Sequence, residues 1–177
     1  IIFTNAFHIE PSGIVINDGE LVLKGNLINN GTLSYTPTST ESTVYFSGNV
    51  QQVLGNQSSI FYNVLFNNNN TILEGDIEVN NDVDFINGIV QNDETNGQFL
   101  FTELSDHINT SNLSFVNGNV LKKGSLDFSF PIGKDSYYRP ISIEGLTSEN
   151  IFLSRYFKQN SNILYPHELK EGIINFI

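Results

Sequence analysis

The sequence predicts an all-β protein: a right-handed parallel β-helix (solenoid) over residues 1–124, followed by a partial antiparallel β-sandwich-like domain. Three observations predict this class. Short apolar segments alternate with polar residues at period two, and Gly, Asn or Asp stands in most of the gaps between them. Asparagine makes up roughly one residue in seven, which suits a fold with many tight corners. No long segment has a convincing helical pattern.

The stretch 7–35 sets the pattern. It contains three short strands, 14–16, 21–23 and 33–35, separated by Asp-Gly, Gly-Asn and Asn-Gly corners. Strands and corners this short fit a winding coil better than a ladder of hairpins. The same alternation predicts strands at 44–46, 61–66, 72–73, 77–79, 83–85, 89–90, 99–101, 113–115, 120–121 and 126–130. It also places six aromatic side chains in the core: Phe46, Phe61, Phe85, Phe101, Phe115 and Phe128.

Two all-β architectures compete for residues 1–124. A sandwich or jelly roll uses strands of about six residues, whereas a parallel β-helix uses about three shorter strands in each coil of roughly twenty residues. Segments 25–31, 46–50 and 115–120 share an apolar run that ends in a Gly-Asn corner, and this loose repetition favours the β-helix. The run 67–70 predicts a stacked asparagine corner whose amides hydrogen-bond from coil to coil. The sandwich remains the alternative.

The predicted strand length and the proline content change after Gly124. Longer strands are predicted at 126–130, 140–143 and 151–157, and three of the five prolines lie in this part of the chain. We therefore expect a second antiparallel domain over 125–177. Because it is short and ends in an uncapped apolar strand at 173–177, we expect it to be truncated.

Composition excludes several classes of function. Eight Lys and Arg against 19 Asp and Glu give a net charge of −11, which disfavours nucleic acid as a partner. The chain has no cysteine, so disulfides, zinc–thiolate sites and cysteine nucleophiles are absent. No apolar run is long enough to span a bilayer, and we expect a chain that does not cross a membrane. A first residue other than Met indicates a processed chain or a fragment.

Several short motifs resemble a known group of proteins. Segment 130–141, FPIGKDSYYRPI, and segment 154–157, SRYF, are similar to a pattern in large Bacteroidetes cell-surface proteins that the type IX secretion system exports. The upstream FSGN-QQ of 46–52 and F-NV of 61–64 resemble repeats of the same proteins. The resemblance implies an extracellular stalk or display region of an adhesin, in some cases connected with gliding motility. It implies neighbouring domains of the same polypeptide, surface glycans or secretion-system components as partners.

One group of carboxylates forms a candidate metal site. These residues alternate with apolar ones, so in strands they would lie outward on one face, where stacked carboxylates can bind Ca²⁺. The competing interpretation is a solvated acidic face, and no EF-hand or Gly-Gly-x-Gly-x-Asp loop favours calcium over it. Calcium is the only cofactor that the sequence suggests. The residues of this candidate calcium site are Glu74, Asp76, Glu78, Asp82 and Asp84.

An enzyme is disfavoured, and no catalytic residue is predicted. Polysaccharide hydrolysis needs two carboxylates across a groove, and Asp82 with Asp84, or Asp93 with Glu94, are pairs of the kind that chance also supplies. The three histidines are scattered without metal-binding spacing, and surface or half-buried structural positions are expected for them. No Gly-x-Ser-x-Gly elbow and no phosphate-binding loop is present.

Tyrosines supply the candidate ligand-binding residues. Side chains of this type form a sugar-stacking platform if they align on an outer face, and the five considered are Tyr35, Tyr45, Tyr62, Tyr137 and Tyr138. Tyr137, Tyr138 and Arg139 are the ligand-binding candidates of the second domain, against the alternative that 138–140 forms a packed corner.

The sequence thus predicts a non-catalytic, extracellular structural and display module at the cell surface. A β-solenoid is a stiff rod, which suits it to extension and display. The alternatives are a glycan-binding adhesin domain and a lyase- or hydrolase-type β-helix that acts on polysaccharides.

Overall fold

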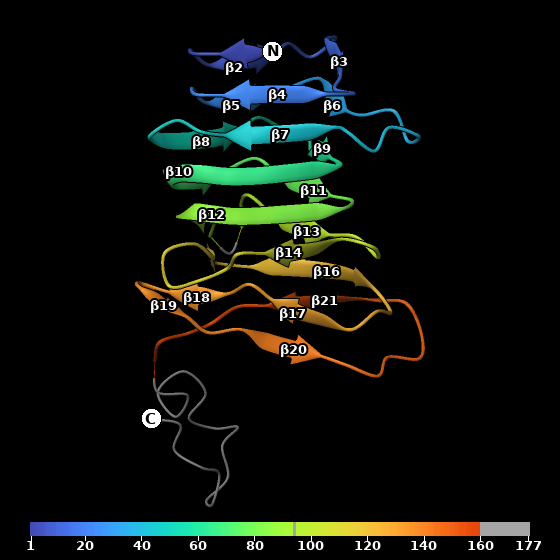
Figure 1. Ribbon diagram of the computed structural model, residues 1–177, viewed down its shortest axis with the longest axis vertical. Helices are drawn as coiled ribbons and strands as arrows, with labels where there is room; N and C mark the ends of the chain where they lie inside the picture. Colours follow the sequence, from blue (N-terminus) through green and yellow to red (C-terminus); the bar gives the residue numbers. More distant parts are fainter. Residues whose placement is uncertain (94, 160–177) are drawn as a thin grey trace, which may run out of the picture.

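The computed structural model describes residues 1–93 and 95–159, and these residues wind into a parallel β-solenoid of about six coils with additional antiparallel strands at its C-terminal end (Figure 1). Parallel pairing between successive coils confirms the predicted β-helix and excludes the sandwich for the first part of the chain. None of the described residues is helical, and no helix there is long and apolar enough to cross a membrane.

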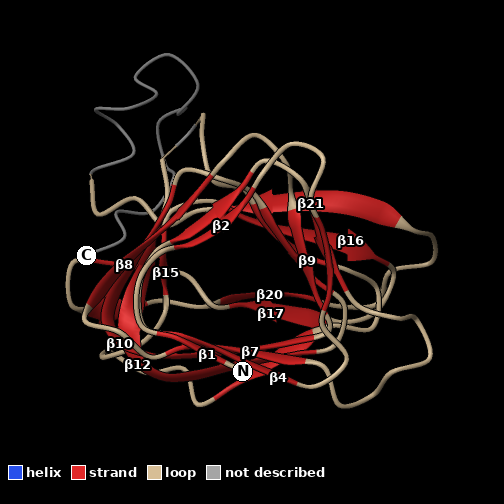
Figure 2. Ribbon diagram, turned by 90° about the horizontal axis from the view of Figure 1, so that it is seen from above, coloured by secondary structure: helices blue, strands red, loops and turns tan. Residues whose placement is uncertain are grey.

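Each coil has three sides, and the strands of each side stack along the long axis (Figure 2). The first side holds β1 (Ile2–Phe3), β4 (Glu20–Leu23), β7 (Thr43–Phe46), the first parts of β10 (Asn63–Leu73) and β12 (Asp82–Gln91), and β14 (Asp106–Ile108). The second side holds β2 (Phe7–Ile9), β5 (Leu27–Asn29), β8 (Val50–Leu54), the later parts of β10 and β12, and β15 (Val116–Asn117). These two sides form one ten-stranded sheet.

The third side is a separate sheet of seven strands. It holds β3 (Ile14–Ile16), β6 (Thr32–Ser34), β9 (Ser59–Phe61), β11 (Ile77–Val79), β13 (Phe99–Phe101) and β16 (Val120–Gly124), with β21 (Asn150–Ser154) at its edge. All pairings in this sheet are parallel except that of β21, which runs antiparallel to β16.

The core is a column of rings inside the coils. Phe46, Phe66 and Phe85 stand in register on β7, β10 and β12, and their rings stack with centroid distances of 5.2 and 5.7 Å. Each ring is fully buried, which contributes about 1.5–3 kcal/mol per side chain. All six phenylalanines that the alternation places inside are buried, so this prediction is confirmed.

Amide side chains bind neighbouring coils to one another at the corners. Asn69 donates to Asn49 one coil earlier, and Gln91 donates to Asn70 over 3.1 Å. Inside the coil, the amide nitrogen of Asn68 donates to the Thr71 hydroxyl over 2.8 Å. The predicted coil-to-coil asparagine corner is therefore confirmed.

The antiparallel strands close the C-terminal end of the coils. These strands are β17 (Phe128–Phe130), β18 (Gly133–Lys134), β19 (Tyr137–Tyr138) and β20 (Ile141–Ile143), in addition to β21. β17 pairs with β20 and β18 with β19, whereas a parallel bridge from Val116 to Ile132 continues the second side of the solenoid.

These closing strands share the solenoid's hydrophobic core. The buried Phe128, Phe130 and Ile132 belong to the same apolar cluster as the rings of the coils. Seen along the axis, β17 and β20 lie within the outline of the coils (Figure 2). We call residues 125–157 the cap. The predicted second domain also includes 160–177, and its predicted strand at 173–177 lies outside the described residues.

Candidate functional site

The structure does not gather the five predicted calcium ligands. Glu78 lies on β11 of the seven-stranded sheet, whereas Asp82 and Asp84 lie on β12 of the ten-stranded sheet. Glu74 and Asp76 occupy the corner between β10 and β11. Within residues 1–93 and 95–159, no group of three or more His, Asp or Glu side chains is placed to hold a metal ion.

Three of these carboxylates accept hydrogen bonds that join coils instead. The Glu74 carboxylate accepts from Gln52 over 3.3 Å, and Asp76 accepts the backbone N–H of Gln98 over 2.8 Å. Asp84 accepts from the side chain of Asn109 over 2.8 Å. This arrangement supports the role of a solvated outer face that also links neighbouring coils.

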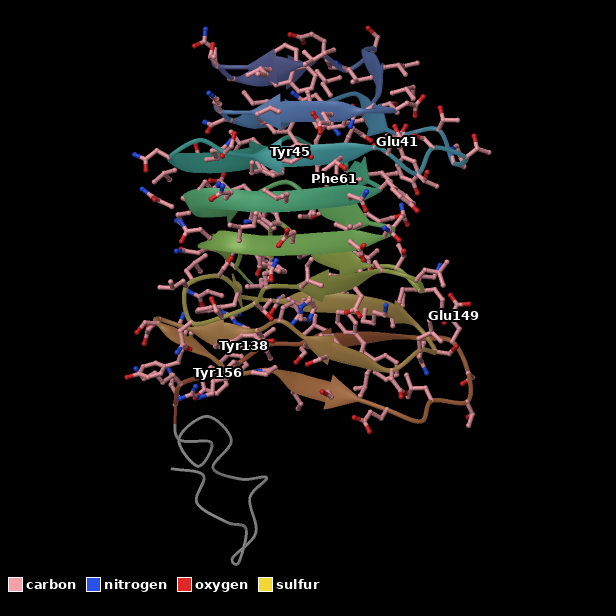
Figure 3. The ribbon with its side chains drawn as sticks, in the orientation of Figure 1. Glu41, Tyr45, Phe61, Tyr138, Glu149 and Tyr156 are labelled. Atoms are coloured by element: carbon pink, nitrogen blue, oxygen red, sulfur yellow. The ribbon has the colours of Figure 1, made fainter. Side chains whose placement is uncertain are left out.

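The three ligand-binding candidates of the cap lie in and beside the β18–β19 hairpin. The Tyr138 hydroxyl accepts from Thr110 over 2.9 Å, and Figure 3 shows Tyr138 at the level of the cap. Tyr137 is exposed, with the Lys158 ammonium 4.5 Å and the Arg139 guanidinium 5.1 Å from its ring centre. Tyr138 is thus half-buried, while Tyr137 is the more exposed of the two tyrosine rings.

A hollow lies on the outer face of the seven-stranded sheet. It has a volume of about 610 Å³, and we call it the tyrosine groove. One end is formed by the segment that follows β6, and the other by the loop before β21. In Figure 3, Glu41 of the first loop and Glu149 of the second lie on the same side of the molecule, at different heights along the axis. The residues that matter to its chemistry are Tyr35, Tyr62, Glu78, Asn80, Thr102 and Lys123.

Coil stacking brings these residues together from distant parts of the sequence. Phe61, Val79, Phe101 and Lys122 are in register on neighbouring strands and point inward. Because side chains alternate across a strand, each following residue faces outward. Tyr62, Asn80, Thr102 and Lys123 therefore form an outer row with the strand spacing of about 4.8 Å. This row places an aromatic, an amide, a hydroxyl and an ammonium side chain at regular intervals along the axis.

Two tyrosines form the N-terminal end of the groove. The rings of Tyr35 and Tyr62 have centroids 5.3 Å apart and are tilted by 57°. Burial raises the pKa of the Tyr35 phenol, although a hydrogen bond from the Asn80 side chain opposes the rise. The phenol consequently stays protonated at neutral pH, and it can both donate and accept a hydrogen bond.

Acidic groups dominate the charge of the groove. Glu78, Glu103 and Glu149 line it together with a single cation, Lys123. Lys123 lies 3.6 Å from Glu149, and both side chains are exposed, so this pair contributes little to stability. Glu103 accepts the backbone N–H and the hydroxyl of Ser125 over 2.7 and 3.1 Å, which fixes its carboxylate in place. The groove therefore disfavours anionic ligands.

Two ionisable side chains point into the last coil, away from the groove. His107 continues an inward column of aliphatic residues, and its Nε2 lies 2.6 Å from the carbonyl of Ser129. Because a carbonyl only accepts, Nε2 carries the proton, and the buried Nδ1 has no hydrogen-bond partner. Burial lowers the pKa of His107, although the nearby Asp106 opposes this. The expectation of a half-buried structural histidine fits this position.

Lys122 is the second of these groups and is almost fully buried. Its ammonium donates to the carbonyls of Thr102, Glu103 and Ser105 over 2.7, 3.0 and 2.7 Å. It also lies 4.6 Å from the ring centre of Phe128. Burial lowers the pKa of Lys122, while Asp106 and Glu103 oppose this. The side chain thus satisfies a turn whose carbonyls have left the strand ladder.

Part of the groove is predicted by the sequence. Tyr35 and Tyr62 were among its five candidate tyrosines, whereas Tyr45 lies on the ten-stranded sheet beside Glu20. Asn80, Thr102 and Lys123 were not singled out. The signal was present in the sequence, because outer-row residues recur at intervals of about twenty residues, the length of a coil. Comparison of this chain with protein-family models, curated proteins and solved structures found no match.

Proposed function

We propose that this chain is a non-catalytic structural and display module of an extracellular bacterial surface protein. One observation carries the proposal: parallel strands pair from each coil to the next, and the rings of Phe46, Phe66 and Phe85 stack through three successive coils. In such a solenoid each coil stabilises its neighbours. The result is a rod that resists bending and holds its side faces at a distance from the cell surface.

The surface location and the partners rest on the resemblance of the FPIGKDSYYRPI and FSGN-QQ motifs to exported Bacteroidetes proteins. On this proposal, the partners are neighbouring domains of the same polypeptide, surface glycans or components of the secretion system. Labelling of unpermeabilised producer cells with an antibody against this chain tests the location. Signal that requires permeabilisation would contradict it.

Single-molecule pulling between residues 1 and 159 tests the mechanical role. A rod built coil by coil is expected to lengthen in steps of about 70 Å, the extended length of roughly twenty residues. An unstructured linker of equal length, pulled in the same apparatus, is the control. Smooth extension that matches the linker would contradict a load-bearing role.

The alternative enzymatic function has a specific feature to test, since the tyrosine groove is lined by three glutamates. Glycoside hydrolysis requires two carboxyl groups on opposite sides of the scissile bond. Incubation with polysaccharides, scored for new reducing ends and unsaturated products, distinguishes the two functions. Product formation that is lost in Glu78→Gln would replace the structural proposal with a catalytic one.

A further inference from the structure

The tyrosine groove has the composition of a binding site rather than of a plain outer face. Its N-terminal end offers two aromatic rings, its floor includes the apolar side chain of Leu100, and its walls carry carboxylate, amide and hydroxyl groups. Ligand sites typically combine an apolar surface with a few polar groups that fix orientation. The outer face of β7 on the other sheet has one tyrosine, Tyr45, which donates to Glu20 over 3.2 Å.

The arrangement of these groups matches the chemistry of a sugar chain. A pyranose ring has an apolar face of C–H groups, which packs on an aromatic ring, and a rim of hydroxyls, which donate to carboxylates and exchange hydrogen bonds with amides. Tyr35 and Tyr62 provide the rings, and Glu78, Asn80 and Thr102 provide the hydrogen-bonding groups beyond them. Because the outer row runs along the solenoid axis, a linear chain would lie parallel to that axis.

The charge of the groove selects among sugar chains. Three glutamates and one lysine line it, in a molecule whose net charge is −11. Uronate and sulfated polymers carry a negative charge on many residues and would meet like charges along the groove. A neutral sugar chain does not experience this repulsion between like charges.

We propose that the tyrosine groove binds a neutral oligosaccharide, with the Tyr35–Tyr62 pair packed against a sugar ring and Glu78, Asn80 and Thr102 bonded to hydroxyls. This site does not depend on the display role, because a groove on one side face works in the same way whether the solenoid is a stalk or an isolated domain.

Titration with neutral hexasaccharides of β-1,4-linked glucose, xylose and mannose and of β-1,3-linked glucose tests the site. The chain has seven tyrosines and no tryptophan, so tyrosine fluorescence reports on the groove without a tryptophan background. Binding of at least one probe at millimolar concentration is expected, and calorimetry measures the affinity. Failure to bind any of the four would overturn the proposal.

Four variants locate the bound probe. Tyr35→Ala and Tyr62→Ala are expected to weaken binding at least about tenfold, as removal of an aromatic anchor does. Tyr45→Ala removes the same side chain from the opposite sheet and is expected to leave affinity unchanged. If Tyr45→Ala weakens binding as much, or if neither groove variant weakens it, the assignment to this groove is wrong. Tyr62→Phe, which keeps the ring, guards against loss through misfolding and is expected to retain most of the affinity.

Hexagalacturonate tests the charge argument. The unmodified protein is expected to bind it at least about tenfold more weakly than the best neutral probe, and Glu78→Gln is expected to narrow this difference. Equal or tighter binding of hexagalacturonate by the unmodified protein would overturn the neutral class. New reducing ends during these titrations would support the groove as the sugar site and contradict the non-catalytic display function, so the two proposals fail separately.

Discussion

The middle coils and the last coil of this solenoid are built from the same three sides but have different interiors. In the middle coils, inward positions carry Val64, Phe66, Val83 and Phe85, all fully buried and apolar. In the last coil, the corresponding positions of the first and third sides carry His107 and Lys122. The comparison shows where ionisable side chains lie inside the described coils: next to the point where parallel stacking stops.

The reason lies in the backbone. Between two coils, the N–H and C=O groups of paired strands bond to each other, and neutral amides such as those of Asn29 and Gln51 satisfy carbonyls at the corners. After β16 the chain enters the antiparallel cap, and the last coil itself begins with a turn over 102–105. Three carbonyls of that turn are satisfied by Lys122, and the Ser129 carbonyl is satisfied by His107.

Removal of a ring from the middle coils is expected to have the largest effect. Phe66→Ala leaves a cavity between Phe46 and Phe85 and should lower the free energy of unfolding by about 3–5 kcal/mol. Leu65→Ala, at the adjacent outward position of the same strand, is the control and should cost less than half as much. Denaturant unfolding measures both. Equal losses would mean that the ring column does not dominate the middle coils.

Replacement of the buried lysine tests the role of the last coil's polar interior. Lys122→Met keeps the apolar stem but removes the ammonium that donates to the carbonyls of Glu103 and Ser105, so we expect a loss of about 2–4 kcal/mol. The Thr102 carbonyl keeps the backbone N–H of Ser105 as a donor. Lys123→Met, one residue further and exposed, should change stability by less than about 0.5 kcal/mol. Hydrogen exchange should show faster exchange in the cap and last coil of Lys122→Met. Uniformly faster exchange across all coils would contradict a local role.

The histidine predicts a dependence of stability on pH. Because the pKa of His107 is lower in the folded protein than its ordinary value of 6.5, the unfolded chain binds more protons just below that pH. Its contribution to stability is complete well above pH 6.5 and is lost as the pH falls through and below this value. Unfolding of His107→Gln should lose this slope, and His8→Gln, at an exposed position, should keep it. An unchanged slope in His107→Gln would show that the carboxylates alone produce it.

Removal of an exposed amide side chain from a corner is expected to have the smallest effect on stability. Asn69→Ala removes an exposed hydrogen bond to Asn49, and we expect a cost of about 0.5 kcal/mol. Asn68→Ala, which removes a buried amide bonded to Gln51 and Thr71, should cost two to three times as much. Thermal unfolding of the two variants compares them. The reverse order would show that outer amides, and not the interior, hold the corners.

The sequence pattern predicted the solenoid because each coil repeats the same two features: apolar and polar residues that alternate along a strand, and a corner that contains Asn or Gly. It divided two strands too finely, since 61–66 and 72–73 lie within or overlap the single strand β10, and 83–85 and 89–90 lie within β12. The polar run 67–70 looks like a break, but its backbone continues to pair with neighbouring coils, with N–H of Asn69 donating to the carbonyl of Asn49. The strand β14 was missed because His107 takes an inward position, where the pattern requires an apolar residue.

The groove was predicted less completely than the core. A single strand reveals which of its side chains face outward, but Tyr35 and Tyr62 meet only because the segment after β6 lies beside the strands of later coils. Glu78 was identified as an outward carboxylate, yet its neighbours in space come from strands about twenty residues away. The number of residues in each coil determines which residues come into contact. This number is difficult to read from the sequence because the loops differ in length.

The stacking of coils also determines how this chain folds. Most strand pairs join residues about one coil apart, so each new coil requires closure of a loop of similar length, however long the solenoid is. Folding can therefore begin at any adjacent pair of coils and proceed like a zipper in both directions, at a rate set by local loop closure rather than by chain length. The cap ends this propagation on one side, because its antiparallel strands β17 and β20 pair with each other.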